Sequence, residues 1–207
     1  MKRQIRRCVF ETNSSSTHAI CIAKDGYELK DHIDFHTGEY GWECEEYGDL
    51  DNKASYLITA ILSMEKEYAD EKLMQLKSIL DDNNITYTIP EPNIKQYKYD
   101  GKTHRYYDTG YDYIDHVEKL KSWLDDLLLD SDKLFRYLFG DSIIITGNDN
   151  DDEFRDRMFI AEGEEETDWG TYTLYGDLKP KFYLVVYIKF ITYVNSKLNI
   201  NFSTKSK

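Results

Sequence analysis

The segment from Glu11 to His18 concentrates more chemically active side chains than any other part of the chain. Its eight residues are three serines, two threonines, an asparagine, a glutamate and a histidine. An imidazole titrates near neutral pH and can act as a general acid or base. Hydroxyl groups and the backbone N–H groups of a turn can hold an anion such as phosphate. The segment therefore predicts a site that handles a phosphate-bearing substrate.

We assign His18 as the general acid or base, Ser16 as its hydroxyl partner, and Glu11, or alternatively Glu39, as the carboxylate that orients the ring. Alternate residues of an extended chain share a face, which favours the pairing of Ser16 with His18. Further residues would bind the substrate through an arginine clamp, hydroxyl and amide groups, a second carboxylate and an aromatic wall. These are Arg7, Asn13, Ser14, Ser15, Thr17, Glu39, Tyr40 and Trp42.

Two simpler interpretations stay open. The polar segment also fits a turn whose Asn and Ser side chains bond to their own backbone, and Trp42 is favoured as a core residue. The spacing matches neither a nucleophile elbow nor a phosphate-binding loop with its lysine. The sequence thus indicates a hydrolase, nuclease or phosphoryl-transfer type of reaction on a nucleotide or RNA, and it identifies no cofactor and no metal ligand set.

A family resemblance rests on the same residues. The stretch RCVFETNSSSTH, from Arg7 to His18, resembles the opening of a group of small proteins encoded by phages and prophages of low-GC Gram-positive bacteria. Residues 38–43, which read GEYGWE, are similar to a later landmark of that group. The resemblance covers the first quarter of the chain. It implies a phage or mobile-element setting, inside a bacterial host, and no particular activity.

The charge balance supports a second hypothesis. The 207 residues include 39 Asp and Glu against 26 Lys and Arg, which gives a net charge of −13. Phosphate repulsion then disfavours binding to duplex DNA. A phage protein of this charge is also suited to be a non-catalytic inhibitor that mimics nucleic acid and binds a host defence protein, as an anti-CRISPR protein does. The blander explanation is that the charge serves solubility.

Cysteine usage and hydropathy indicate a cytoplasmic protein. Cys8, Cys21 and Cys44 are too few for a disulfide scaffold. The basic N-terminus lacks the apolar run of a signal peptide. The longest apolar run, at 182–194, contains Lys189 and is too short to span a bilayer. We expect no membrane association.

Three further patterns carry weaker signals. His32 and His36 have the spacing of metal ligands on a helix, but no third ligand is defined, so ordinary histidines are favoured. The acidic run at 149–153 lacks the spacing of a calcium loop and fits a solvated turn. The stretch at 95–107 interleaves Lys, His and Arg with tyrosines. It fits contact with single-stranded nucleic acid, although ordinary cross-strand pairs of a hairpin are favoured.

The elements that would position these residues follow from hydrophobic periodicity. We expect strands at 5–10, 19–23, 85–89, 142–146, 171–175 and 181–194, a hairpin or loop at 93–111, and helices at 52–64, 73–82, 111–129 and 131–139. Asp51 or Asn52 is predicted to cap the first helix. This order predicts an α+β fold, with a mixed or antiparallel sheet and helices packed on one side. One domain would span 1–195, with a frayed tail at 196–207.

Overall fold

A four-stranded antiparallel sheet forms the base of the molecule. A computed structural model describes residues 16–23, 26–41, 43, 45–115, 120–148, 159–160, 174–175 and 182–189. The strand order in the sheet is β10 (Phe182–Lys189), β1 (Ser16–Ala23), β7 (Ile143–Asn148) and β3 (Glu46–Tyr47). Strand β1, which continues from the Ser-rich segment, is therefore an inner strand, paired with β10 on one side and β7 on the other.

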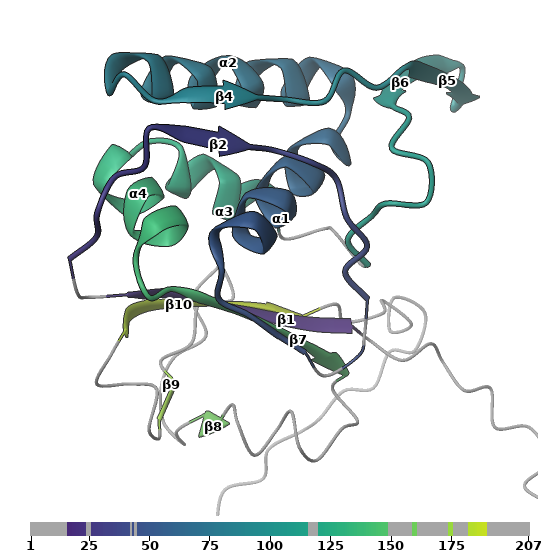
Figure 1. Cartoon of the computed structure of the whole chain (residues 1–207). Helices are drawn as coiled ribbons and strands as arrows, with labels where there is room; N and C mark the ends of the chain where they lie inside the picture. The colour runs from purple at the N-terminus through teal and green to yellow at the C-terminus, as the bar shows by residue number, and fades with distance from the viewer. Residues whose placement is uncertain are drawn as a thin grey trace, which may run out of the picture.

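Helices cover one face of this sheet in two layers (Figure 1). The inner layer contains α1 (Leu50–Leu62), α3 (Leu120–Leu127) and α4 (Ser131–Phe139). Beyond it lie α2 (Lys66–Asp82) and a parallel strand pair, β2 (His32–Asp34) with β4 (Thr86–Thr88). The expected α+β class, with helices packed on one side of an antiparallel sheet, is confirmed.

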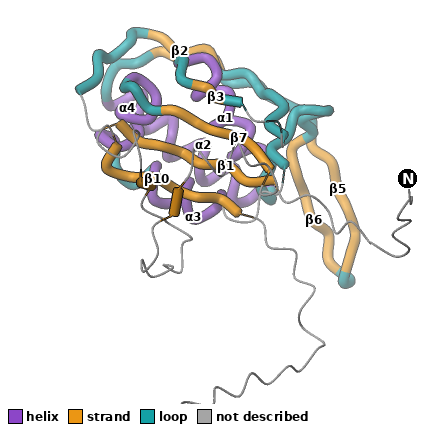
Figure 2. The backbone as a smooth tube through the Cα atoms, turned by 90° about the horizontal axis from the view of Figure 1, so that it is seen from below, coloured by secondary structure: helices purple, strands orange, loops and turns teal. Residues whose placement is uncertain are grey.

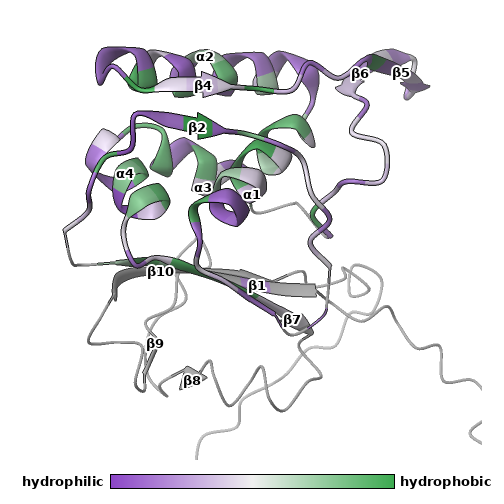
Figure 3. Ribbon diagram, viewed as in Figure 1, coloured by the Kyte–Doolittle hydropathy of each residue, from purple (hydrophilic) through white to green (hydrophobic). Residues whose placement is uncertain are grey.

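Helix α1 is the centre of the core. Every residue from Lys53 to Leu62 is buried, as expected for a helix with neighbours on all sides. The sheet contributes Ile20, Ile22 and Ile144 to the same core. In Figure 3 the hydrophobic residues of α1, α3 and α4 gather in the interior, whereas much of α2 is hydrophilic.

Two local predictions are wrong in their boundaries. Helix α1 is capped by Asp49, whose carboxylate accepts a hydrogen bond from the backbone N–H of Asn52, rather than by Asp51 or Asn52. The helix expected at 111–129 is not formed at its start, because residues 111–115 pair with another segment. The N–H of Tyr40 donates to the carbonyl of Tyr113, and Ile114 forms an isolated bridge with Tyr40. This tertiary pairing overrides the local helical pattern.

The predicted hairpin is formed by β5 (Ile94–Tyr99) and β6 (Lys102–Tyr107), which extend from one side of the body (Figure 2). Asp100 and Gly101 join the strands with φ of 49° and 72°, the backbone of a two-residue type I′ turn. A further small pair joins β8 (Phe159–Ile160) to β9 (Leu174–Tyr175).

Some of the remaining predicted elements are present in the structure, and others lie outside the described residues. Helix α4 and strands β4 and β7 match their predicted places, whereas α2 ends where predicted but begins at Lys66, seven residues before the predicted start. The expected strand at 5–10, the acidic run at 149–153 and the tail at 196–207 lie outside the described residues. Within the described residues, no helix combines the length and the apolar character needed to cross a membrane.

Candidate functional site

The geometry around His18 decides what this residue can do. Strand β1 carries His18 on the face that also presents Ile20 and Ile22 to the helices, since alternate strand residues share a face. Its side chain is 2% exposed. The imidazole is therefore enclosed between the sheet and α1.

Both nitrogens of the His18 ring are hydrogen bonded to groups of the protein. Nδ1 lies 2.9 Å from the hydroxyl oxygen of Tyr56, and Nε2 lies 2.8 Å from the backbone carbonyl oxygen of Gly41. A carbonyl can only accept, so Nε2 carries a proton and donates to Gly41. In the neutral ring Nδ1 then accepts from the Tyr56 hydroxyl. These bonds join β1 to α1 and to the loop between β2 and β3.

A chain of aromatic rings extends from Tyr56, the hydrogen-bond partner of His18. Tyr56 contacts Tyr40 at 4.9 Å and Trp123 at 5.9 Å between ring centroids, and Trp123 contacts Tyr137 at 5.5 Å. The rings meet edge to face, which is a favourable arrangement. Burial raises the pKa of Tyr56 and of Tyr137 well above the ordinary range, so both remain protonated. The cluster packs the core and keeps its hydroxyls as hydrogen-bond donors.

The structure describes only part of the predicted substrate-binding set. Tyr40 is buried and its hydroxyl donates to the carbonyl of Asn52, whereas Glu39 is exposed on the surface. For Ser16 and Thr17 the structure describes only the backbone, within β1. The other predicted site residues lie outside the described residues: Arg7, Glu11, Asn13, Ser14, Ser15 and Trp42. The pairing of Ser16 with His18, and the role of Glu11, stay predictions.

The histidine pair does not have the helical spacing of metal ligands. His32 lies in strand β2, where its ring nitrogens contact the hydroxyl of Thr86 at 2.7 Å and the carboxylate of Asp34 at 3.0 Å. His36 follows in an extended segment and is exposed. In the described part of the chain, no three His, Cys, Asp or Glu side chains are arranged to hold a metal ion.

Two buried lysines escaped the sequence analysis. Lys53 is 2% exposed and its ammonium group donates to the carbonyl of Gly140 at 2.7 Å, at the C-terminal end of α4. Lys72 is 4% exposed and lies 2.6 Å from the Asp125 carboxylate of α3. Both lie on the apolar stripe of their helix, three or four positions from buried residues, and that spacing was a usable signal.

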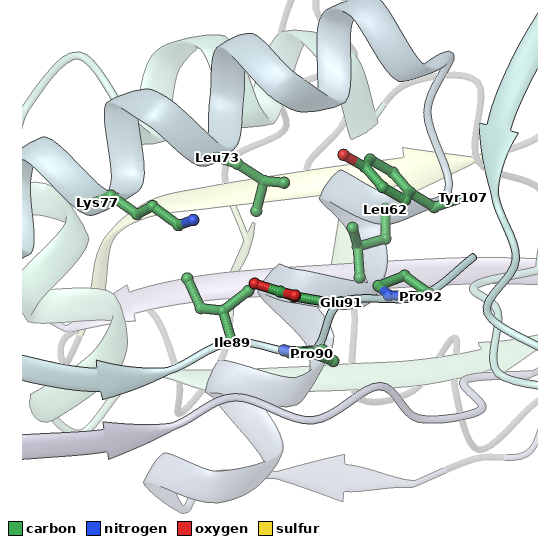
Figure 4. Close-up of a pocket in the computed structure, with 8 residues that line it drawn as sticks. All are labelled: Leu62, Leu73, Lys77, Ile89, Pro90, Glu91, Pro92 and Tyr107. Carbon is green, nitrogen blue, oxygen red and sulfur yellow. The ribbon is translucent and has the colours of Figure 1, made fainter. Parts of the chain in front are cut away.

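A small recess lies between α2 and the segment that follows β4 (Figure 4). Its volume is about 270 Å³, and Leu62, Leu73 and Ile89 line it. Lys77 reaches into it from α2, and Glu91 extends from the opposite segment. Both of these charged residues are exposed, so the recess is an open depression of the surface.

Comparisons of this chain with protein-family models, with curated proteins and with solved structures return no match.

Proposed function

We propose that the protein acts by binding rather than by catalysis at His18, and that its acidic surface occupies the basic nucleic-acid groove of a host defence protein. The enclosure of His18 is the observation that carries this proposal. A general acid or base has to reach a proton of the substrate. His18 is 2% exposed and its ring bonds to Tyr56 and Gly41, and such contacts are typical of a structural residue.

The charge distribution supports the binding role. Residues 37–52 contain no Lys, Arg or His. They carry six exposed carboxylates, Glu39, Glu43, Glu45, Glu46, Asp49 and Asp51. The segment includes β3, an edge strand of the main sheet. Carboxylates grouped in this way can replace phosphates against a basic groove and accelerate association with it.

The choice of target follows from the phage-like opening of the sequence. A phage protein with a net charge of −13 would gain from blocking a defence protein that has to hold nucleic acid, such as a CRISPR effector. Such a protein would act in the cytoplasm of the bacterial host. The mechanism requires no substrate turnover and no cofactor.

A displacement assay tests the proposal. Purified host defence proteins are loaded with a fluorescein-labelled oligonucleotide, and the release of the label is measured as the acidic protein is added. The variant Glu43→Gln/Glu45→Gln/Glu46→Gln is expected to need at least five times more protein for the same release. The matched control Glu28→Gln/Asp82→Asn/Glu91→Gln changes the net charge equally at other exposed positions. This control should release the oligonucleotide at the same protein concentration as the wild type. Added salt should weaken the release by the wild type.

Two results would overturn the proposal. An equal loss of oligonucleotide release in both triple variants would show that release depends only on the net charge of the protein. Turnover of a nucleotide or RNA that disappears in folded Ser16→Ala and His18→Gln variants would restore the catalytic hypothesis for residues 11–18.

A further inference from the structure

We infer that the β5–β6 hairpin carries a binding face for single-stranded nucleic acid. The inference is independent of the proposed function, because it concerns another surface with the opposite charge. The register pairs Tyr97 with His104, Tyr99 with Lys102 and Lys95 with Tyr106. Directly opposed residues share a face, as do alternate residues of one strand. These six side chains form what we call the tyrosine face.

The tyrosine face exposes aromatic rings that the core does not use. Tyr97 is 52% exposed and Tyr99 is 50% exposed. The Tyr99 ring stacks on the His104 ring, with 3.8 Å between ring centroids and 10° between the ring planes. The ring centroids of Tyr97 and Tyr106 are 6.1 Å apart. Each half-exposed ring is thus supported from the opposite strand while its outer surface stays in solvent. Supported rings of this kind are platforms on which bases stack.

The spacing of the rings fits an unstacked strand. Tyr97 and Tyr99 are alternate residues of β5, so their positions are roughly 7 Å apart along the strand. Two bases can stack on two rings at this separation only when they are unstacked from each other, as single strands allow. A duplex keeps its bases stacked inside, which leaves them out of reach of the rings.

The hairpin is also the basic part of an acidic protein. Residues 94–107 contain four Lys or Arg side chains against one Asp. Within the described residues, neither Lys98 nor Lys102 forms an ion pair, and both are exposed. Lys102, on the tyrosine face, can neutralise a phosphate of a strand that stacks there, and Lys98, on the opposite face, adds to the positive potential around it. The remaining charge of the molecule makes this binding weak and sensitive to salt.

Contacts on both faces hold the hairpin in place. On the tyrosine face, His104 Nδ1 lies 3.0 Å from the Glu65 carboxylate. The other contacts come from the opposite face. Arg105 pairs with Glu67 of α2, and the Tyr107 hydroxyl donates to Asp70 at 2.6 Å. Lys66 lies 5.2 Å from the centroid of the Tyr107 ring. The Asp100–Gly101 turn fixes the other end. Because the hairpin is ordered before it meets a ligand, binding loses little conformational freedom.

Fluorescence anisotropy with labelled oligonucleotides tests the inference. The probes are a 12-nucleotide oligouridylate, a 12-nucleotide oligothymidylate and a 12-base-pair DNA duplex, each at low salt. We expect the wild type to bind both single strands and not the duplex, and a difference between the two strands would show whether the 2′-hydroxyl contributes. Tyr97→Ala/Tyr99→Ala should raise the Kd at least tenfold, since each base loses the ring on which it stacks.

Matched controls separate this site from general effects. Tyr111→Ala/Tyr113→Ala removes two exposed tyrosines outside the hairpin and should leave the Kd unchanged. Lys98→Gln/Lys102→Gln should weaken binding and lower its salt dependence, whereas Lys30→Gln/Lys77→Gln should do neither to the same extent. All of these positions are on the surface, so thermal unfolding should match the wild type.

Three outcomes would overturn the inference. These are no single-strand binding by the folded wild type at 100 μM protein, equal effects of the hairpin and control variants, or equal binding of the duplex. If the hairpin variants keep single-strand binding but lose the displacement of oligonucleotide described above, the tyrosine face is a protein contact instead. The carboxylate variants and the hairpin variants thus report on the two proposals separately.

Discussion

His18 Nδ1 and the Tyr56 hydroxyl oxygen lie 2.9 Å apart, and this hydrogen bond joins an inner strand of the sheet to the central helix. The two residues are separated by 38 positions in the chain. Tyr56 is fully buried, so a lost bond leaves a polar atom without water to replace its partner. The hydrogen bond therefore stabilises the fold in two ways. It links the strand to the helix, and it gives the buried His18 nitrogen and the buried Tyr56 hydroxyl a hydrogen-bond partner each.

The first prediction is an energetic coupling between these two residues. Tyr56→Phe should lower the free energy of unfolding by about 1–3 kcal/mol, because the His18 ring loses its donor. His18→Ala should cost about 3 kcal/mol, since it also leaves a cavity. In the His18→Ala background the further cost of Tyr56→Phe should fall by about 1 kcal/mol. Urea denaturation of the four proteins measures the cycle, and additivity within about 0.5 kcal/mol would refute the coupling.

The second prediction concerns Lys53. Burial lowers its pKa from 10.5 to about 8, against the opposing effect of the Asp141 and Asp49 carboxylates. Between these two pH values the unfolded chain binds a proton that the folded protein does not, so stability rises with pH, by up to about 1.4 kcal/mol per pH unit. Below pH 8 both states are protonated and the dependence on Lys53 disappears.

Lys53→Met should remove this rise, which is measured as the urea midpoint between pH 8 and pH 9.5. The upper limit matters because the buried Tyr56 and Tyr137 have raised pKa values. Above pH 10 they ionise in the unfolded chain first, which lowers stability and would mask the lysine. Lys30→Met, at an exposed position, is the control. An identical pH profile for Lys53→Met and wild type would contradict the assignment.

The third prediction is an asymmetry within the ion pair that joins α2 to α3. The Lys72 side chain is 5% exposed, and the Asp125 side chain is 42% exposed. Burial lowers the pKa of Lys72, but its bonds to Asp125 and Glu71 outweigh this, so the pKa is raised overall. Asp125 also accepts a hydrogen bond from Tyr68 at 2.9 Å. The buried Lys72 charge therefore needs its ion-pair partner more than the half-exposed Asp125 charge does.

Asp125→Asn should therefore destabilise the protein more than Lys72→Met does. The first change leaves a buried ammonium group without its main counter-charge, at a cost of about 2–3 kcal/mol. The second replaces the lysine with an apolar residue of similar length and leaves the aspartate its solvent and its tyrosine donor. Thermal unfolding at neutral pH ranks the two variants. The reverse order would show that the aspartate, not the lysine, is the buried charge at risk.

Local signals in the sequence were sufficient for part of this fold. The apolar stripe predicted the C-terminal part of α2, and residues 93–111 were expected to form a hairpin or a loop, because these features depend on neighbours along the chain. The partners of His18 could not be predicted in this way. Tyr56 and Gly41 are 38 and 23 positions away, and only the packing of the sheet on α1 brings them to the ring.

Other features were hidden for related reasons. The parallel pairing of β2 with β4 involves strands of three residues each, which are too short for a clear alternation. The pattern at 111–115 suggests a helix, but Tyr40 pairs with this segment and holds it extended. The sequence alone showed that the hairpin is rich in tyrosine. Which face the tyrosines share required the register, and the half-exposure of Tyr97 and Tyr99 required the structure.

The fourth prediction concerns the cap of α1, where the sequence named the wrong residue. The carboxylate of Asp49 accepts from the backbone N–H of Asn52 at 2.9 Å and from its side-chain amide at 2.7 Å. These two bonds hold the pKa of Asp49 below its usual value of 3.8. A carboxylate whose pKa is lowered by folding stabilises the protein above the unfolded pKa. That contribution is lost as the pH falls through the folded pKa.

Asp49→Ala should cost about 1 kcal/mol at neutral pH, whereas Asp51→Ala should cost a few tenths of that, since Asp51 only faces the helix dipole. Asp49→Asn should keep most of the stability at pH 7, because asparagine also caps helices. It should, however, reduce the loss of stability below pH 4 relative to the wild type, since the amide does not titrate. Urea midpoints at pH 7 and pH 3 distinguish the three variants. If Asp51→Ala proves the more costly change, the helix begins two residues later, where the sequence alone had suggested.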